Sequence, residues 1–202
     1  MISDQQPVTE KSKFRSLSKP VRRKLQHRRS IESCAYLRDD GLWDVEARMI
    51  DIKTETVPLP LRGDVAAGEP FHDLGLRVTL DQRLLIHQIE AFIDASPFPI
   101  CARITGSFRV LEGTRIGPGW HRQCKELTGG FRGCTHLNEL LPVIATTAIQ
   151  AVWPNSDLEV MKLGASMMVN SCHSWAQNSE VIEELLPEYY TPEVPDTSIK
   201  QE

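Results

Sequence analysis

The chain has 202 residues, of which 41% are apolar and 25% charged, and its formal net charge is −4. These proportions are those of a globular protein, and a net negative charge argues against nucleic acid as the main ligand. No run of about 18 apolar residues occurs, so no membrane contact is expected.

The chain carries five cysteines, an odd number at irregular spacing: Cys34, Cys101, Cys124, Cys134 and Cys172. The N-terminus lacks the apolar core of a secretion signal, so the expected compartment is the cytoplasm. In a reducing compartment such cysteines are free thiols, metal ligands or nucleophiles rather than a disulfide framework.

Charge divides the chain into three parts. We predict a basic, partly disordered arm over residues 1–32, a single α+β domain over 33–178 and an acidic tail over 179–202. The arm either contacts an anionic ligand or folds over its own acidic domain.

The first half of the domain reads as β structure. A turn signal at 39–41 separates two extended segments, and residues 43–49 then alternate apolar with polar side chains. Similar alternation predicts strands over 74–80 and 85–93. His87 falls on the aliphatic side of the last strand, where a hydrogen-bonded core histidine is expected.

The second half changes to a helical period. One helix is predicted to open near Cys101 and a short one to contain Trp120 and Cys124. A long helix is predicted within the stretch 133–153, with Thr135 as its N-cap. Strands followed by helices predict an α+β fold, in which helices cover one face of a three- to four-stranded antiparallel sheet.

Candidate chemistry falls at the ends of these elements. His72 and Asp73 are placed in the loop before a strand, Cys101 at one helix start, and Cys134 with His136 at another, where the helix dipole favours a thiolate. Element ends of this kind can share one edge of the domain. The set His72, Asp73, Cys101 and Cys134 would suffice as tetrahedral ligands for one Zn²⁺ or Fe²⁺.

Three motifs in order strengthen this hypothesis: Gly-Glu-Pro-Phe-His-Asp at 68–73, Pro-Ile-Cys-Ala at 99–102 and Gly-Cys-Thr-His-Leu at 133–137. Over roughly residues 65–153 this order resembles the iron–sulfur cluster scaffold proteins of the NifU N-terminal type. The resemblance places His72 at their first cysteine ligand and Asp73 near their aspartate. It places Cys101 and Cys134 at the second and third cysteines.

The departures from that pattern are specific. A histidine replaces the first cysteine, Gly133 stands where a histidine precedes the third, and residues 128–132 replace the chaperone-binding segment. The whole chain also resembles an uncharacterised bacterial domain-of-unknown-function family with the Gly-Cys-Thr-His-Leu motif. That resemblance implies a place beside enzymes of aromatic or steroid breakdown.

The residues leave four hypotheses open. The first is a metal-dependent catabolic enzyme, a lyase, isomerase or hydrolase acting on a small aromatic or steroid-type intermediate, with His72, Cys134 and His136 in catalysis. The second is a metal or iron–sulfur carrier. The third is a cofactor-free enzyme with a cysteine nucleophile and a histidine base. The fourth is a binding module with a structural metal site or plain core thiols. The expected cofactor is mononuclear zinc or iron, and a homo-oligomer is compatible with the sequence.

Overall fold

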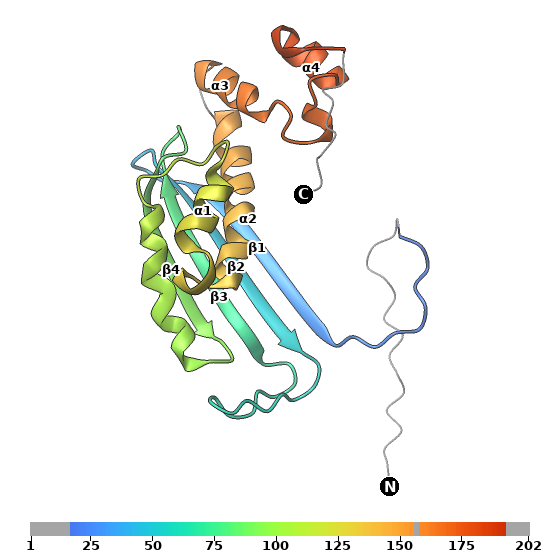
Figure 1. Cartoon of the computed structure of the whole chain (residues 1–202), viewed down its shortest axis with the longest axis vertical. Helices are drawn as coiled ribbons and strands as arrows, with labels where there is room; N and C mark the ends of the chain where they lie inside the picture. The colour runs from blue at the N-terminus through green and yellow to red at the C-terminus, as the bar shows by residue number, and fades with distance from the viewer. Residues whose placement is uncertain (1–16, 156–157, 193–202) are drawn as a thin grey trace.

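A computed structural model describes residues 17–155 and 158–192 of the chain. Its centre is an antiparallel sheet in the order β1-β2-β3-β4 (Figure 1). The strands are β1 (His27–Leu37), β2 (Trp43–Lys53), β3 (Pro70–Leu80) and β4 (Ile86–Ala95). The predicted turn at 39–41 joins β1 to β2. The boundary predicted between arm and domain, at residue 32, lies inside β1.

Helical segments cover one face of the sheet, which confirms the predicted α+β class (Figure 1). They are η1 (Pro99–Leu111), a 3₁₀ helix, and the α-helices α1 (Trp120–Thr128) and α2 (Thr135–Val152). The buried residues of α2 recur at three- and four-residue steps, as the sequence predicts: Leu137, Leu140, Leu141, Ile144, Ala145, Ala148 and Val152. The predicted cap is wrong by one residue, because Cys134, with extended backbone, precedes the first helical residue.

Beyond α2 the chain forms smaller elements: η3 (Trp153–Asn155), α3 (Leu158–Met168), η4 (His173–Trp175), α4 (Glu180–Leu185) and η5 (Pro187–Tyr189). Ala165, Ile182 and Leu186 form a small buried cluster there, separate from the main core. The predicted acidic tail therefore contains a helix in its described part.

Residues 1–16 of the predicted arm and 193–202 of the tail lie outside the described residues. Among the described helices, none has the length and apolarity needed to cross a membrane.

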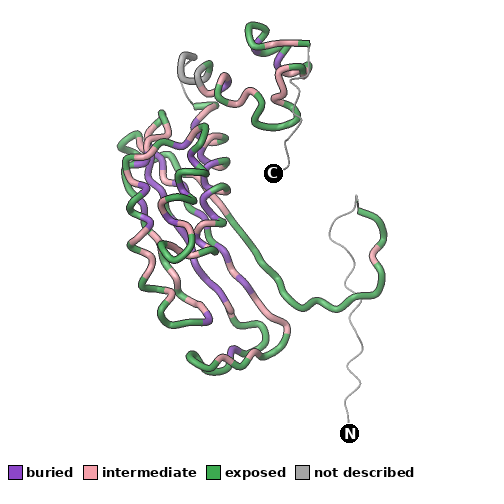
Figure 2. The backbone as a smooth tube through the Cα atoms, viewed as in Figure 1, coloured by how far each residue is buried: buried purple, intermediate pink, exposed green. Residues whose placement is uncertain are grey.

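Strand alternation decides which side chains reach the core, seen as buried stretches along β2 and β3 in Figure 2. Odd-numbered residues of β2 and even-numbered residues of β3 face the helices. In β4 the pairing with β3 skips one residue, since Thr79 pairs with Gln88 and Leu80 with Ile86. This irregularity turns His87 outward, 3.5 Å from Asp81, so the predicted core histidine is wrong.

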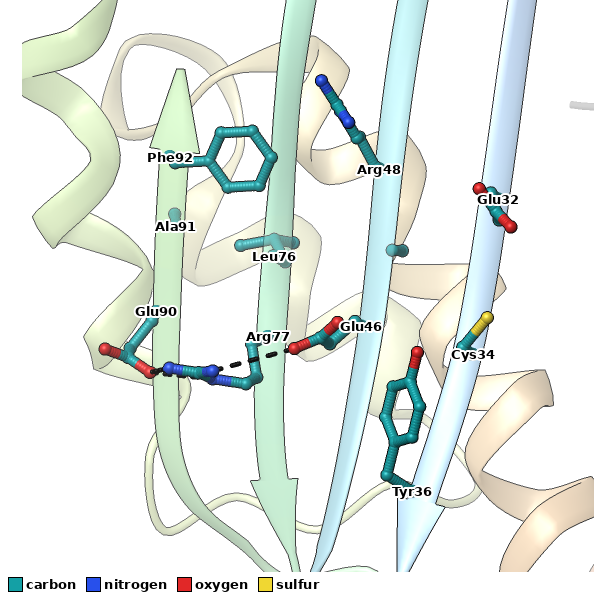
Figure 3. A pocket seen from close by; sticks show the side chains of 11 residues that line it. Glu32, Cys34, Tyr36, Glu46, Arg48, Leu76, Arg77, Glu90, Ala91 and Phe92 are labelled. Carbon is teal, nitrogen blue, oxygen red and sulfur yellow. Dashed lines mark hydrogen bonds and ion pairs between the residues drawn. The ribbon is translucent and has the colours of Figure 1, made fainter. Parts of the chain in front are cut away.

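On the opposite face of the sheet no helix of the described residues is packed, and the side chains there are strongly charged (Figure 3). A hollow of about 540 Å³ lies over it. Arg77 on β3 bridges Glu46 on β2 and Glu90 on β4, so its charge is already neutralised. Phe92 lies against Gly75, where an added Cβ would come within 2.5 Å of both the Phe92 ring and the Ala47 carbonyl oxygen.

Gly75 is therefore a position that only glycine fits. Gly75→Ala should lower the free energy of unfolding by roughly 1–3 kcal/mol, because the neighbouring strand backbone cannot move aside. The measurement is urea denaturation followed by circular dichroism. Gly106→Ala is the matched control, since an added Cβ there meets no atom within 4 Å. Equal effects of the two substitutions would contradict the steric argument.

Candidate metal centre

A cavity of about 270 Å³ opens where β3 and β4 meet the starts of η1 and α2. Its lining consists of two imidazoles, two thiols and an apolar remainder: His72, Leu74, Ile93, Ser96, Pro97, Phe98, Cys101, Cys134 and His136. Four of the five site residues expected from the sequence thus border one cavity, although they come from three distant segments. The side chains of Cys101 and Cys134 are half-buried, so they are not fully enclosed core residues.

Asp73, the fifth, is not in this cavity. Its carboxylate accepts hydrogen bonds from Arg48 Nε at 2.8 Å and Nη2 at 2.6 Å, on the face of the sheet that carries no helix. The sequence places His72 and Asp73 in a loop, whereas β3 begins at Pro70 and includes both. Successive residues of a strand point to opposite faces, so one of the two must leave the site.

Asp51 on β2 supplies the carboxylate instead. It is 1% exposed and pairs directly with His72 across the β2–β3 ladder, with Nδ1 of His72 3.0 Å from Oδ2. Arg29 on β1 donates from Nε to Oδ1 and from Nη2 to Oδ2, both at 2.8 Å. His27 Nε2 lies 3.3 Å from Oδ1. Both oxygens of Asp51 therefore already contact cationic or imidazole groups, and the contact with Nδ1 fixes the orientation of the His72 ring.

Opposing effects set the charge of Asp51. Burial raises the pKa of this carboxyl, but the hydrogen bonds and charge of Arg29, helped by His27 and His72, outweigh burial and lower the pKa to about 2. Asp51 is therefore ionised throughout the physiological range. An ionised carboxylate can only accept, so Nδ1 of His72 carries the proton that it donates to Asp51.

His72 is the most perturbed histidine of the cavity. Burial, followed by the nearby imidazole of His136, lowers the pKa of His72 to about 4, against the opposing pull of Asp51. At neutral pH the ring is thus uncharged, and with Nδ1 bound to Asp51 its Nε2 keeps a free lone pair. This is the state in which histidine binds a metal or accepts a proton.

His136 lies next to the ring of His72. The ring centroids of His72 and His136 are 4.0 Å apart at an interplanar angle of 38°. Within the described residues, Asp51, His72 and His136 have ligand atoms within 4.8 Å of one another. The sulfurs of Cys101 and Cys134 are not in this close group, although both residues line the same cavity.

The polypeptide before α2 is held so that Cys134 faces the cavity. Asn138 donates through Nδ2 to the carbonyls of Thr128, at 2.7 Å, and Cys134, at 3.1 Å. At Gly133 a side chain is excluded, because a Cβ would lie 2.0 Å from the Thr128 carbonyl oxygen. Cys101 enters η1 through a backbone N–H bond to the Phe98 carbonyl at 3.0 Å.

The other three cysteines lie elsewhere. Cys124 is buried in α1, and burial raises the pKa of its thiol to about 12, so it is an inert core residue. Cys34 lies on the charged face of the sheet, and Cys172 is exposed.

Sequence reasoning missed Asp51 and Arg29. The signal was present, because the alternation of buried side chains at 43, 45, 47 and 49 continues to position 51. A carboxylate at a buried position requires a cationic or hydrogen-bonding partner. That partner comes from β1, which the sequence assigns in part to the arm.

A family model described as "Protein of unknown function (DUF2889)" matches residues 27–150, more than half of the chain. The chain belongs to this family. The matched range begins with the first residue of β1 and contains every residue that lines the cavity. The expected domain-of-unknown-function family is thus confirmed, and the match does not support a NifU-type scaffold. Neither the curated proteins nor the solved structures gave a match.

The donor set in this DUF2889 domain suits a borderline-soft divalent metal. Imidazole and thiolate together favour zinc or iron over magnesium or calcium, which prefer oxygen ligands. A histidine whose other nitrogen is held by a carboxylate is the usual arrangement of metal-binding histidines. The same cavity offers thiols and a base, so nucleophilic chemistry is the competing use of these residues.

The lowered pKa of His72 predicts an acid-sensitive domain. The unfolded chain takes up a proton near pH 6.5, whereas folded His72 does so only near 4. The stabilisation from keeping this ring neutral is therefore complete above 6.5 and is lost as pH falls towards 4, by roughly 3 kcal/mol. Asp51 loses its contribution only below this window.

Urea denaturation between pH 7 and 4.5, with a chelator present, measures this loss. The His72→Gln variant should show a shallower fall in stability over that range, and His87→Gln, at an exposed position, should retain the full slope. A slope unchanged in His72→Gln would contradict the assignment.

Proposed function

We propose that the chain is a metal-dependent enzyme in which His72, Cys101 and Cys134 would hold one zinc or ferrous ion. The ligand atoms of these three residues do not all lie within 4.8 Å of one another in the described structure, so they would draw together when the ion binds. The observation that carries the proposal is the meeting of two imidazoles and two thiols around one cavity, with a buried carboxylate fixing the tautomer of His72. A neutral, oriented imidazole in a poorly solvated place is costly to keep, and such perturbed groups cluster at functional sites.

Three protein ligands leave one tetrahedral position free. Catalytic zinc sites keep such a position for water or substrate, whereas structural sites are closed by four protein ligands. Asp73, which would have completed the set expected from the sequence, is instead paired with Arg48 on the far face of the sheet. Asp73 would therefore not fill the fourth position, which would be left for water or substrate.

In this proposal His136 would move the proton. Its half-buried ring lies against that of His72 in the same cavity, which supports such a role. The metal would polarise a carbonyl or hydroxyl, and His136 would transfer the proton. A lyase, isomerase or hydrolase acting on a small molecule with an apolar body is consistent with the apolar walls formed by Leu74, Ile93 and Phe98.

Metal content tests the proposal directly. Untagged protein should contain about one zinc or iron per chain, and Co²⁺ in its place should give a thiolate-to-cobalt charge-transfer band. Cys134→Ser should reduce that band. His72→Ala should weaken cobalt binding more than about 100-fold, because losing a ligand costs at least as much affinity as losing the residue that hydrogen-bonds to it.

The controls make the same substitutions away from the cavity. Cys34 lies on the charged face of the sheet and His87 is exposed. The variants Cys34→Ser and His87→Ala should therefore bind cobalt with the affinity of the natural chain. Protein without metal that still loses a measured activity on thiol alkylation would favour the cofactor-free enzyme instead.

Asp51 is expected to act as a positioning residue. Asp51→Asn keeps the shape of the side chain but removes its charge, so cobalt affinity should fall by about 10–100-fold while the band shape stays the same. Asp73→Asn, one residue beyond His72 but on the other face, should leave the affinity unchanged. Equal losses in both variants would show a general effect of removing acidic charge rather than a role for the Asp51–His72 bond.

A further inference from the structure

The two edges of the sheet differ in whether other segments of the described chain hydrogen-bond to them. At the β4 edge, backbone bonds join Ile86 to Gly113 and Thr114, at 2.8 and 2.9 Å, and η1 packs alongside (Figure 1). At the β1 edge, no element of the described chain pairs with the strand. Natural sheets shield such edges with bulges, prolines or covering loops. β1 has no proline and no bulge over its 11 residues, and its pairing with β2 is regular throughout, so charged side chains are the protection that its own sequence carries.

The free edge presents a regular set of backbone groups. Gln26 and Arg38, which flank β1, bond inward to Thr54 and Leu42. Even-numbered residues therefore turn their N–H and C=O groups towards β2, and odd-numbered residues turn theirs outward. The outward set is His27, Arg29, Ile31, Ser33, Ala35 and Leu37.

Two charged side chains on this strand make no ion pair within the described residues, although Glu32 lies opposite Arg48 on β2 and feels its charge. Arg28 and Glu32 lie four residues apart on the helix-free face, where Figure 3 shows Glu32. They are symmetric about Ser30. If two copies of β1 pair antiparallel with their two-fold axis at Ser30, Arg28 of each copy lies opposite Glu32 of the other.

We propose that a second copy of this chain occupies the β1 edge in this register, giving one continuous eight-stranded sheet. Axes at Arg28, Arg29 or Glu32 would put like charges directly opposite one another, which is unfavourable. Because 28, 30 and 32 share a parity, this register also keeps the helices of both copies on the same side of the sheet.

The chain before β1 fits the same arrangement. It leaves the body of the domain in an extended path (Figure 1), and its apolar residues are exposed, with Leu25 at 46% and Val21 at 85%. Continuing the pairing places Leu25 opposite Ala35 of the second copy. Ala35 borders the main core, so the pairing would cover apolar surface that one copy leaves in water.

The first test is the mass of the full chain in solution, measured by light scattering after size exclusion. The expected mass is twice the 22.8 kDa of one chain. Ile31→Pro should yield monomers with unchanged circular dichroism, because proline at an odd position removes only an outward N–H. A natural chain that is monomeric over the accessible concentrations, or a dimer that survives Ile31→Pro, overturns the proposal.

The second test fixes the register by charge exchange. Arg28→Glu and Glu32→Arg should each weaken dimerisation by about tenfold, since two attractive pairs become repulsive. The double variant should recover the affinity of the natural chain, because the opposite charges again face each other. If the two effects merely add, the strands pair in another register and the proposal fails. Neither residue touches the cavity, so cobalt binding by these variants should be unchanged.

Discussion

The structure depends on one buried charge, the carboxylate of Asp51. A carboxylate that is 1% exposed must be compensated on every side, and here three strands contribute to that compensation. Arg29 comes from β1 and His72 from β3, and Asp51 lies between them on β2. Arg29 also contacts Glu139 on α2, so the same network joins the sheet to the helix that begins beside Cys134. The geometry of the candidate site therefore follows from an electrostatic requirement of the fold.

That requirement also defines what His72 can do. An imidazole held by an ionised acceptor has one tautomer and one free nitrogen, and burial keeps that nitrogen unprotonated at neutral pH. Without Asp51 the ring could rotate or exchange tautomers. Without burial it would be protonated over part of the physiological range. The larger hollow on the opposite face lacks this property, since Arg77 and Arg48 there are already paired with carboxylates.

Sequence periodicity correctly predicted the parts of the fold that depend only on the local spacing of apolar and polar residues. The apolar face of α2, the hairpin turn and the alternation of β2 each follow from local spacing, and all three are present. The prediction failed where a single residue of offset mattered. Starting β3 at Pro70 rather than after His72 sends Asp73 to the other face, and a skipped residue in β4 turns His87 outward. Strand parity has a period of two, so an error of one residue reverses every side chain beyond it.

The site was predictable to the extent that its members stand at element ends. Cys101 lies in the first turn of η1, Cys134 directly precedes α2 and His72 lies near the start of β3, and these three ends border one cavity. Asp51 and Arg29 lie inside strands and are joined only by the register of three strands, which no local pattern encodes. Arg29 also stands on an edge strand whose outer backbone groups are unpaired within the described chain. Edge strands open more readily than central ones. The charge balance of Asp51, and through it the tautomer of His72, therefore depends on how firmly β1 is held. The second copy proposed for that edge would hold β1 in place and so would stabilise this arrangement.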